Sequence, residues 1–217
     1  MRQHVARFRG EACPLGLSPE IPLNMKIGPS RRDVLTLRAA DGEARVLGER
    51  VLLLVARMDA RERGKGHREL INLLPSLLGI WPDVQLVFPG PGEDRRNLKT
   101  LAARKGVASS VFLPGFVPGK TLIHLYRHCY AFVMPSRQEG FGLAYLEAMN
   151  FGKPCVGCFD QGAEDVIVHG ETGLLVVDPS DTEDAREFGS KGFDRLHAHF
   201  TPARVQTCVK EKMAGIL

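Results

Sequence analysis

The chain has 217 residues, of which 44% are hydrophobic and 25% charged, and its formal net charge is +4. A chain of this length buries a core without metal or disulfide staples, and a mild positive charge spread along the sequence favours no nucleic-acid partner. Five scattered cysteines, and no apolar stretch near the ~20 residues of a membrane span, predict a cytoplasmic protein with at most peripheral contact with the inner face of the membrane.

Residues 1–48 show no hydrophobic periodicity, and prolines and glycines interrupt them throughout. Within them, Arg31-Arg32 and Asp41-Gly42 are typical of turns or linkers. We therefore expect an irregular N-terminal segment or linker over residues 1–48 and one folded domain over residues 49–217.

Continuous apolar runs recur after residue 50, and helical patterns lie between them. Such runs are typical of strands buried on both faces. The expected strands are 51–55, 84–88, 111–113, 131–134, 155–159 and 174–177, and the expected helices are 67–78, 94–105, 121–129 and 143–151. This alternation predicts an α/β fold, a doubly wound parallel sheet of the Rossmann-like type, whose ligands bind at the carboxyl ends of the strands.

The segment after the fourth expected strand is the most informative strand end. Gly140 and Gly142 flank Phe141 where a helix begins, and glycine lets a ligand approach the backbone. The N–H groups and dipole of a first helical turn suit a phosphate. Arg57 and Lys65 follow the first expected strand and supply balancing positive charge.

Two glutamates accompany this helix start, Glu139 before it and Glu147 inside it. Phosphates repel a carboxylate, so each glutamate needs a different partner. Sugar hydroxyls are the natural one, because a carboxylate accepts two hydrogen bonds from a vicinal diol.

Three stretches carry a family resemblance: Val55–Ile71 (VARMDARERGKGHRELI), Met134–Met149 (MPSRQEGFGLAYLEAM) and Gly170–Val177 (GETGLLVV). They resemble the C-terminal, donor-binding domain of the retaining GT-B glycosyltransferases of family 4, which include sucrose synthases and mannosyltransferases. The central signature of that family is a pair of glutamates with seven residues between them, met here by Glu139 and Glu147. The resemblance covers residues 51–178 and implies that the chain is one half of a GT-B fold.

The resemblance also implies an activity, the transfer of a hexosyl group with retention from a uridine or guanosine diphosphate sugar. Arg57 and Lys65 would grip the diphosphate, and Glu139 would contact the transferred sugar as the catalytic residue. Such enzymes use no metal or cofactor, because cations and a helix dipole neutralise the leaving diphosphate.

The remaining implied contacts are with the phosphates, the ribose and the base of the donor. Glu147 would hold the ribose diol, and the backbone near Val117 would meet the base. The phosphate and sugar contacts would come from the helix start, at Gly140, Phe141, Gly142 and Leu143.

Other motifs in the sequence give weaker indications of function. Residues 115–121 resemble a P-loop but have one residue too few between the glycines, and no G-x-G-x-x-G follows the first strand. Cys155 and Cys158 form a lone pair within an expected strand, which favours packing over zinc. His124 and His128 stand four residues apart on a helix, but no third ligand is evident nearby.

Two departures from the family pattern leave the role of the chain open. We expect the family's N-terminal, acceptor-binding domain to be absent, and the helical end after Asp178 to be shortened. The chain is then a fragment of a longer glycosyltransferase, a donor-binding subunit with a separate acceptor-domain partner chain, or a non-catalytic nucleotide-sugar-binding subunit or interaction protein. The four residues expected to contact the donor, at positions 57, 65, 139 and 147, are all present, which favours the first two of these alternatives.

Overall fold

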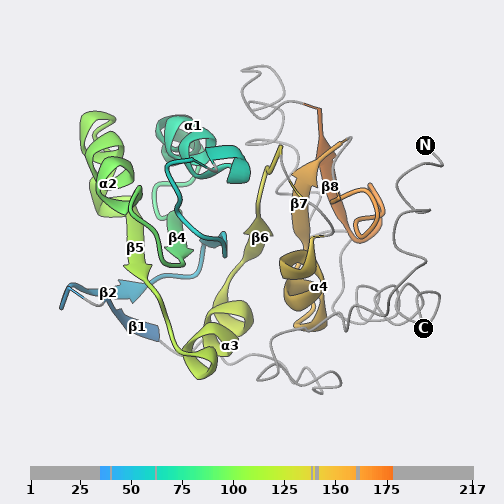
Figure 1. Ribbon diagram of the computed structural model, residues 1–217, viewed down its shortest axis with the longest axis horizontal. Coiled ribbons are helices and arrows are strands. Elements are labelled where there is room, and N and C mark those ends of the chain that lie inside the picture. The colour runs from blue at the N-terminus through green and yellow to red at the C-terminus, as the bar shows by residue number, and fades with distance from the viewer. Residues whose placement is uncertain are drawn as a thin grey trace.

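The computed structural model describes residues 35–39, 41–61, 63–137, 139, 142–159 and 162–177. The expected shortening after Asp178 lies outside these residues. A six-stranded sheet forms the centre of the described part (Figure 1), and each of its pairings is parallel. Its strands are β3 (Val51–Leu53), β4 (Gln85–Pro89), β5 (Val111–Gly115), β6 (Ala131–Val133), β7 (Cys155–Cys158) and β8 (Gly173–Val176). The predicted parallel α/β sheet is confirmed.

The order of the strands determines where a ligand can bind. Across the sheet they run β5-β4-β3-β6-β7-β8, which is the order of the Rossmann fold. The first strand, β3, therefore pairs with the fourth, β6, with Leu52 opposite Ala131 and Leu53 opposite Phe132. The chain reverses its direction of winding at this pair, so the loops that follow β3 and β6 leave the same edge of the sheet as neighbours.

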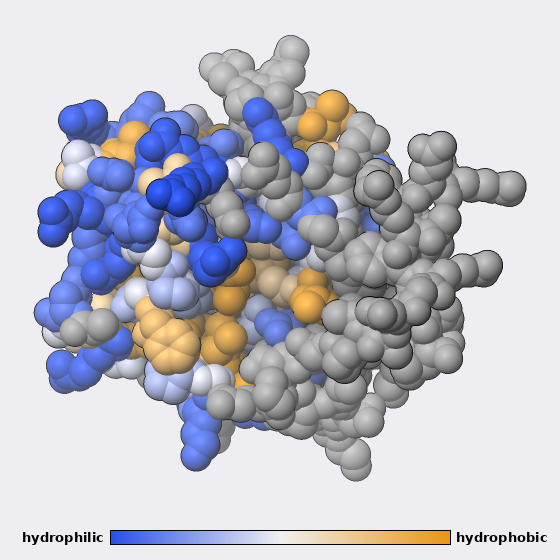
Figure 2. Space-filling view, in the orientation of Figure 1, coloured by the Kyte–Doolittle hydropathy of each residue, from blue (hydrophilic) through white to orange (hydrophobic). Residues whose placement is uncertain are grey.

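The four predicted helices are present with ends shifted by at most two residues: α1 (His67–Ile80), α2 (Arg95–Arg104), α3 (Gly119–His128) and α4 (Leu143–Asn150). Leu70, Leu74 and Leu77 are buried on α1, whereas Pro75 lies on its exposed side and does not end the helix. Helix α1 packs beside α2 (Figure 1), and hydrophilic side chains cover both (Figure 2). Within the described ranges, none of the helices has the length and apolar character needed to cross a bilayer.

Within the segment 1–48 that was expected to be irregular, two stretches in the described part form an antiparallel hairpin instead. Its strands are β1 (Leu35–Arg38) and β2 (Ala44–Leu47), joined through the turn predicted at Asp41-Gly42. Leu37 and Leu47 are buried in the same hydrophobic core as the sheet. Two four-residue strands produce too short an alternation to stand out in the sequence, and their stability comes from packing on the domain.

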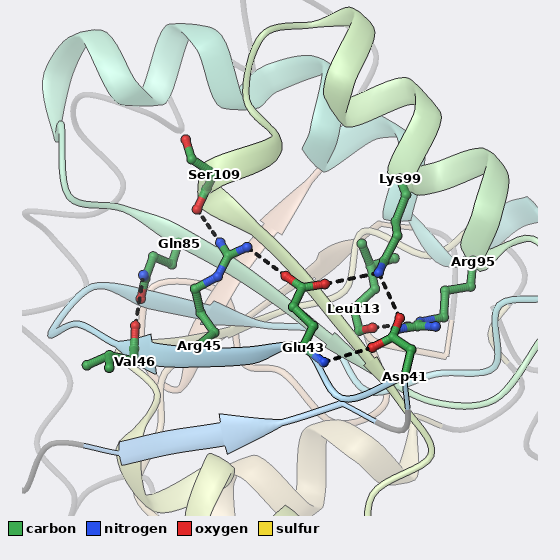
Figure 3. Close-up of polar contacts among 9 residues, drawn as sticks. All are labelled: Asp41, Glu43, Arg45, Val46, Gln85, Arg95, Lys99, Ser109 and Leu113. Atoms are coloured by element: carbon green, nitrogen blue, oxygen red, sulfur yellow. Dashed lines mark hydrogen bonds and ion pairs between the residues drawn. The ribbon is translucent and has the colours of Figure 1, made fainter.

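Charged side chains join this hairpin to α2 (Figure 3). Lys99 Nζ donates hydrogen bonds to Asp41 Oδ2 and Glu43 Oε2, both at 3.0 Å. Arg95 Nη2 donates to Asp41 Oδ2 at 2.8 Å, and its Nε donates to Leu113 O at 2.7 Å. The Lys99 hydrogen bonds hold the pKa values of Asp41 and Glu43 below their usual range, and Arg95 lowers that of Asp41 further.

We expect Lys99→Ala to lower the urea midpoint at pH 7 and to lower it less at pH 3. A carboxylate whose pKa is depressed by folding contributes its full stabilisation above its unfolded pKa of about 4, and this contribution already shrinks at pH 3, as the pH falls from the unfolded value toward the folded one. Arg96→Ala, at an exposed position on the same helix, is the control. Equal losses at both pH values, or in both variants, would show that the hairpin does not depend on these ion pairs.

Candidate functional site

The loops after β3 and β6 pack tightly against one another at the carboxyl edge of the sheet. Arg137 N donates to Gly64 O at 2.7 Å, so the second loop is hydrogen-bonded to the 3-10 turn Arg63–Lys65 of the first. Gly66 has a φ of +92°, and a Cβ there would lie 2.6 Å from Pro135 Cδ. Only glycine fits this close approach, which fixes the distance between the two loops.

This packing brings Lys65 and Glu139 together across 74 residues of sequence. Lys65 Nζ lies 3.1 Å from Glu139 Oε2, and the two side chains are 22% and 15% exposed. The backbone of Glu139 is also held, because Gly162 N donates to Glu139 O at 3.2 Å. A partly desolvated cation and a carboxylate thus meet where parallel sheets bind ligands, and an anionic ligand would compete with Glu139 for Lys65.

The start of α4 borders this pair. Gly142 is its N-cap, with a φ of +80°, and a Cβ at that position would lie 2.5 Å from Cδ2 of the Tyr145 ring. Among the described residues no side chain caps the helix, and the first N–H groups of a helix have no partner within it. Tyr145 N already donates to Gly142 O at 2.9 Å, so the N–H groups of Leu143 and Ala144 are the ones suited to an anion. Gly140 and Phe141 lie outside the described residues, so their roles stay predictions.

Glu147 lies one turn further into α4 and is half-buried. Tyr126 Oη, on α3, donates a hydrogen bond to Glu147 Oε2 at 2.7 Å. Burial, and then the charge of Glu147, raise the pKa of Tyr126 well above its usual value, so this hydroxyl stays protonated and remains a donor. The sequence patterns did not single out Tyr126, because a tyrosine inside an amphipathic helix resembles any core residue.

The loops after β4 and β5 continue the same edge. Met58 N donates to Pro91 O at 2.8 Å, and this bond places the segment that carries Arg57 beside the loop after β4. Arg57 itself is exposed. After β5, Phe116 is 71% exposed and Val117 is half-buried. The structure therefore places Arg57 and Val117 at the predicted edge, with Val117 at the far end from Glu139.

His67 follows Lys65 after Gly66 but adds no positive charge at neutral pH. Its side chain is buried against Phe88, with ring centroids 5.2 Å apart. Burial lowers its pKa to about 4, so the imidazole is neutral at pH 7. The next residue, Arg68, binds the buried Asp94 through Nη2 at 2.7 and 2.8 Å and so joins α1 to α2. Of Lys65, His67 and Arg68, Lys65 is thus the one whose charged side chain contacts Glu139.

The cysteine pair and His128 occupy positions at which they pack or bond within the fold. Cys155 and Cys158 are buried as free thiols in β7, in agreement with the predicted packing. His128 Nε2 forms a 2.8 Å hydrogen bond with Gly48 O. In the described part of the chain, His, Cys, Asp and Glu side chains form no group of three or more that could hold a metal ion.

Comparisons with known proteins find a family match and relatives over much of the chain. Residues 40–188 match the family described as glycosyl transferases group 1. A relative from Mycolicibacterium smegmatis, a GDP-mannose-dependent alpha-(1-6)-phosphatidylinositol monomannoside mannosyltransferase, is 34% identical over 67% of this chain and 39% of its own length. The chain spans about a third of the length of the curated relatives it matches, 32% and 39% for two of them.

Two solved structures share the fold. WaaG, described as a glycosyltransferase involved in lipopolysaccharide biosynthesis, is similar over 76% of this chain and 42% of its own, with a TM-score of 0.57 and 22% identity. HepE from Anabaena, solved with UDP and glucose, is similar over 76% of this chain and 48% of its own, with a TM-score of 0.52 and 22% identity.

Proposed function

The chain belongs to the family of glycosyl transferases group 1, and from this premise we propose that it is the donor-binding part of an enzyme that transfers a sugar from a nucleoside diphosphate sugar with retention. The observation that carries the proposal is the Lys65–Glu139 pair, 3.1 Å apart at the reversal point of the sheet. A diphosphate needs a cation there, and a sugar needs a carboxylate beside it.

In this proposal the donor replaces the Lys65–Glu139 ion pair with two new interactions. The diphosphate takes Lys65 and the N–H groups at the start of α4, and Arg57 adds a second cation. Glu139 is then released toward the hydroxyls of the sugar. Positive charge and a helix dipole stabilise the leaving diphosphate as its charge develops, so we propose transfer without a metal ion.

The rest of the donor would follow the edge of the sheet away from Glu139. Glu147 would hold the ribose, and the backbone near Val117 would meet the base. The mannosyltransferase relative is named as GDP-mannose-dependent, and HepE was solved with UDP and glucose, which supports a nucleoside diphosphate sugar as the donor class. The acceptor would bind on a second domain or partner chain facing this edge, as in the other enzymes of this two-domain architecture.

Calorimetric titration with uridine and guanosine diphosphates and their sugars, in the presence of a chelator, tests this function. We expect binding in the chelator, and we expect Lys65→Ala to weaken it roughly ten- to a hundred-fold, because hydrogen bonds to charged groups are worth about 1.5–3 kcal/mol. Lys105→Ala, at an exposed position beyond the end of α2, is the matched control and should bind normally.

The same titration with the nucleosides alone separates phosphate binding from general damage. Nucleosides without phosphates should bind the Lys65→Ala chain and the unmodified chain alike. A strict requirement for magnesium, or an equal loss for the nucleoside and its diphosphate, would contradict the proposed phosphate site.

A further inference from the structure

Tyr126 combines complete burial with a hydrogen bond that ends on a half-exposed acid. Its ring stacks on Phe151, with centroids 5.8 Å apart and ring planes at 9°, and it lies 6.0 Å from the ring of Phe132. From this packed position its hydroxyl reaches Glu147 Oε2 at 2.7 Å. Helix α3 thereby contacts the acid of α4 through a side chain that is completely buried and packed between two rings.

The hydroxyl is not needed for packing. The contacts with Phe151 and Phe132 are made by the ring, so phenylalanine would fill the same space. What the hydroxyl adds is a fixed donor for one oxygen of a carboxylate. A carboxylate has about four acceptor positions, so Glu147 can bond Tyr126 and still accept from two neighbouring hydroxyls of a ligand.

Holding this carboxylate in one orientation has a consequence for binding. A glutamate side chain loses rotamer entropy when it is ordered, and a donor that orders it beforehand removes that cost from ligand binding. A hydrogen bond from a neutral hydroxyl to a charged carboxylate is also among the stronger kinds in proteins.

We propose that Tyr126 is a positioning residue for the ribose: its hydroxyl holds the Glu147 carboxylate in the orientation that accepts hydrogen bonds from the ribose diol. This inference rests on the proposed function, in which Glu147 binds the ribose. It assigns Tyr126 no contact with the donor, only an effect that passes through Glu147.

Tyr126→Phe tests the inference by titration with UDP and GDP and with their 2′,3′-dideoxy counterparts. We expect the variant to bind the preferred diphosphate roughly 5- to 20-fold more weakly, because ligand binding must then bear most of the rotamer ordering of one glutamate side chain. It should bind the dideoxy ligand within about two-fold of the unmodified chain, because the loss passes through the missing diol. Tyr130→Phe is the matched control, since this tyrosine precedes β6 at the opposite edge of the sheet.

The Glu147→Gln variant separates failure of the inference from failure of the proposed function. If Glu147→Gln removes the preference for the ribose diol and Tyr126→Phe keeps it in full, Tyr126 has no positioning role while the donor site stands. An equal loss for ribose and dideoxy ligands in Tyr126→Phe would show a purely structural hydroxyl and would also overturn the inference. If the unmodified chain itself does not distinguish the two ligands, the ribose role of Glu147 fails and the inference fails with it.

Discussion

Glu139→Gln is expected to slow sugar transfer by roughly 10²–10³-fold, the usual loss when one polar group at a reacting centre is removed. The same change should leave the affinity for a nucleoside diphosphate without sugar unchanged or increased. Lys65 is paired with Glu139 at 3.1 Å before a donor binds, so the diphosphate must displace a carboxylate. A neutral amide competes less for Lys65 and does not repel the phosphates.

Glu147→Gln is the contrasting variant. It should weaken the nucleoside diphosphate and the nucleotide sugar alike, because the ribose is common to both ligands. Titrations of each variant with both ligands measure binding, and the transfer rate is measured with the chain together with its acceptor-binding part. If Glu139→Gln impairs both ligands equally while Glu147→Gln impairs neither, the two roles are assigned wrongly.

Gly66→Ala is expected to destabilise the fold by about 2–5 kcal/mol, the sum of left-handed backbone strain and overpacking. Its φ is +92°, and the new Cβ would lie 2.6 Å from two carbons of the Pro135 ring and 3.0 Å from Pro135 O. The loop that carries Lys65 would have to move away from the loop that carries Glu139. Because a misplacement of about 1 Å can cost 10²-fold in function, we also expect donor binding to fall by at least ten-fold.

Gly106→Ala provides the control for the backbone strain alone. Gly106 has a φ of +71°, but a Cβ there would meet no atom within 4 Å. It should therefore lose only the left-handed strain, about 1–2 kcal/mol, and keep its donor affinity. Urea titration measures the loss of stability in both variants. Calorimetry, under conditions where each variant is folded, measures the affinity for the donor. Equal stability losses in the two variants would mean that the contact between Gly66 and Pro135 is not a tight one.

Local patterns in the sequence were sufficient to predict the secondary structure of the sheet and to nominate residues for the candidate site. Continuous apolar runs marked all six parallel strands, and helical periodicity marked α1 to α4, because burial on both faces and burial on one helical face leave different spacings. The glycines before α4 and the pair Glu139 and Glu147 were recognisable as candidates because they lie within one short stretch of chain.

The tertiary structure decided what depends on contacts between distant segments. The pairing of β3 with β6 places Lys65 against Glu139. The sequence of either loop has no periodicity from which this contact could be predicted. The hairpin at residues 35–47 and the bond from Tyr126 to Glu147 have the same origin, because each is stabilised by partners on another element. Sequence spacing reports the environment along one element, whereas the order of the strands determines which elements meet.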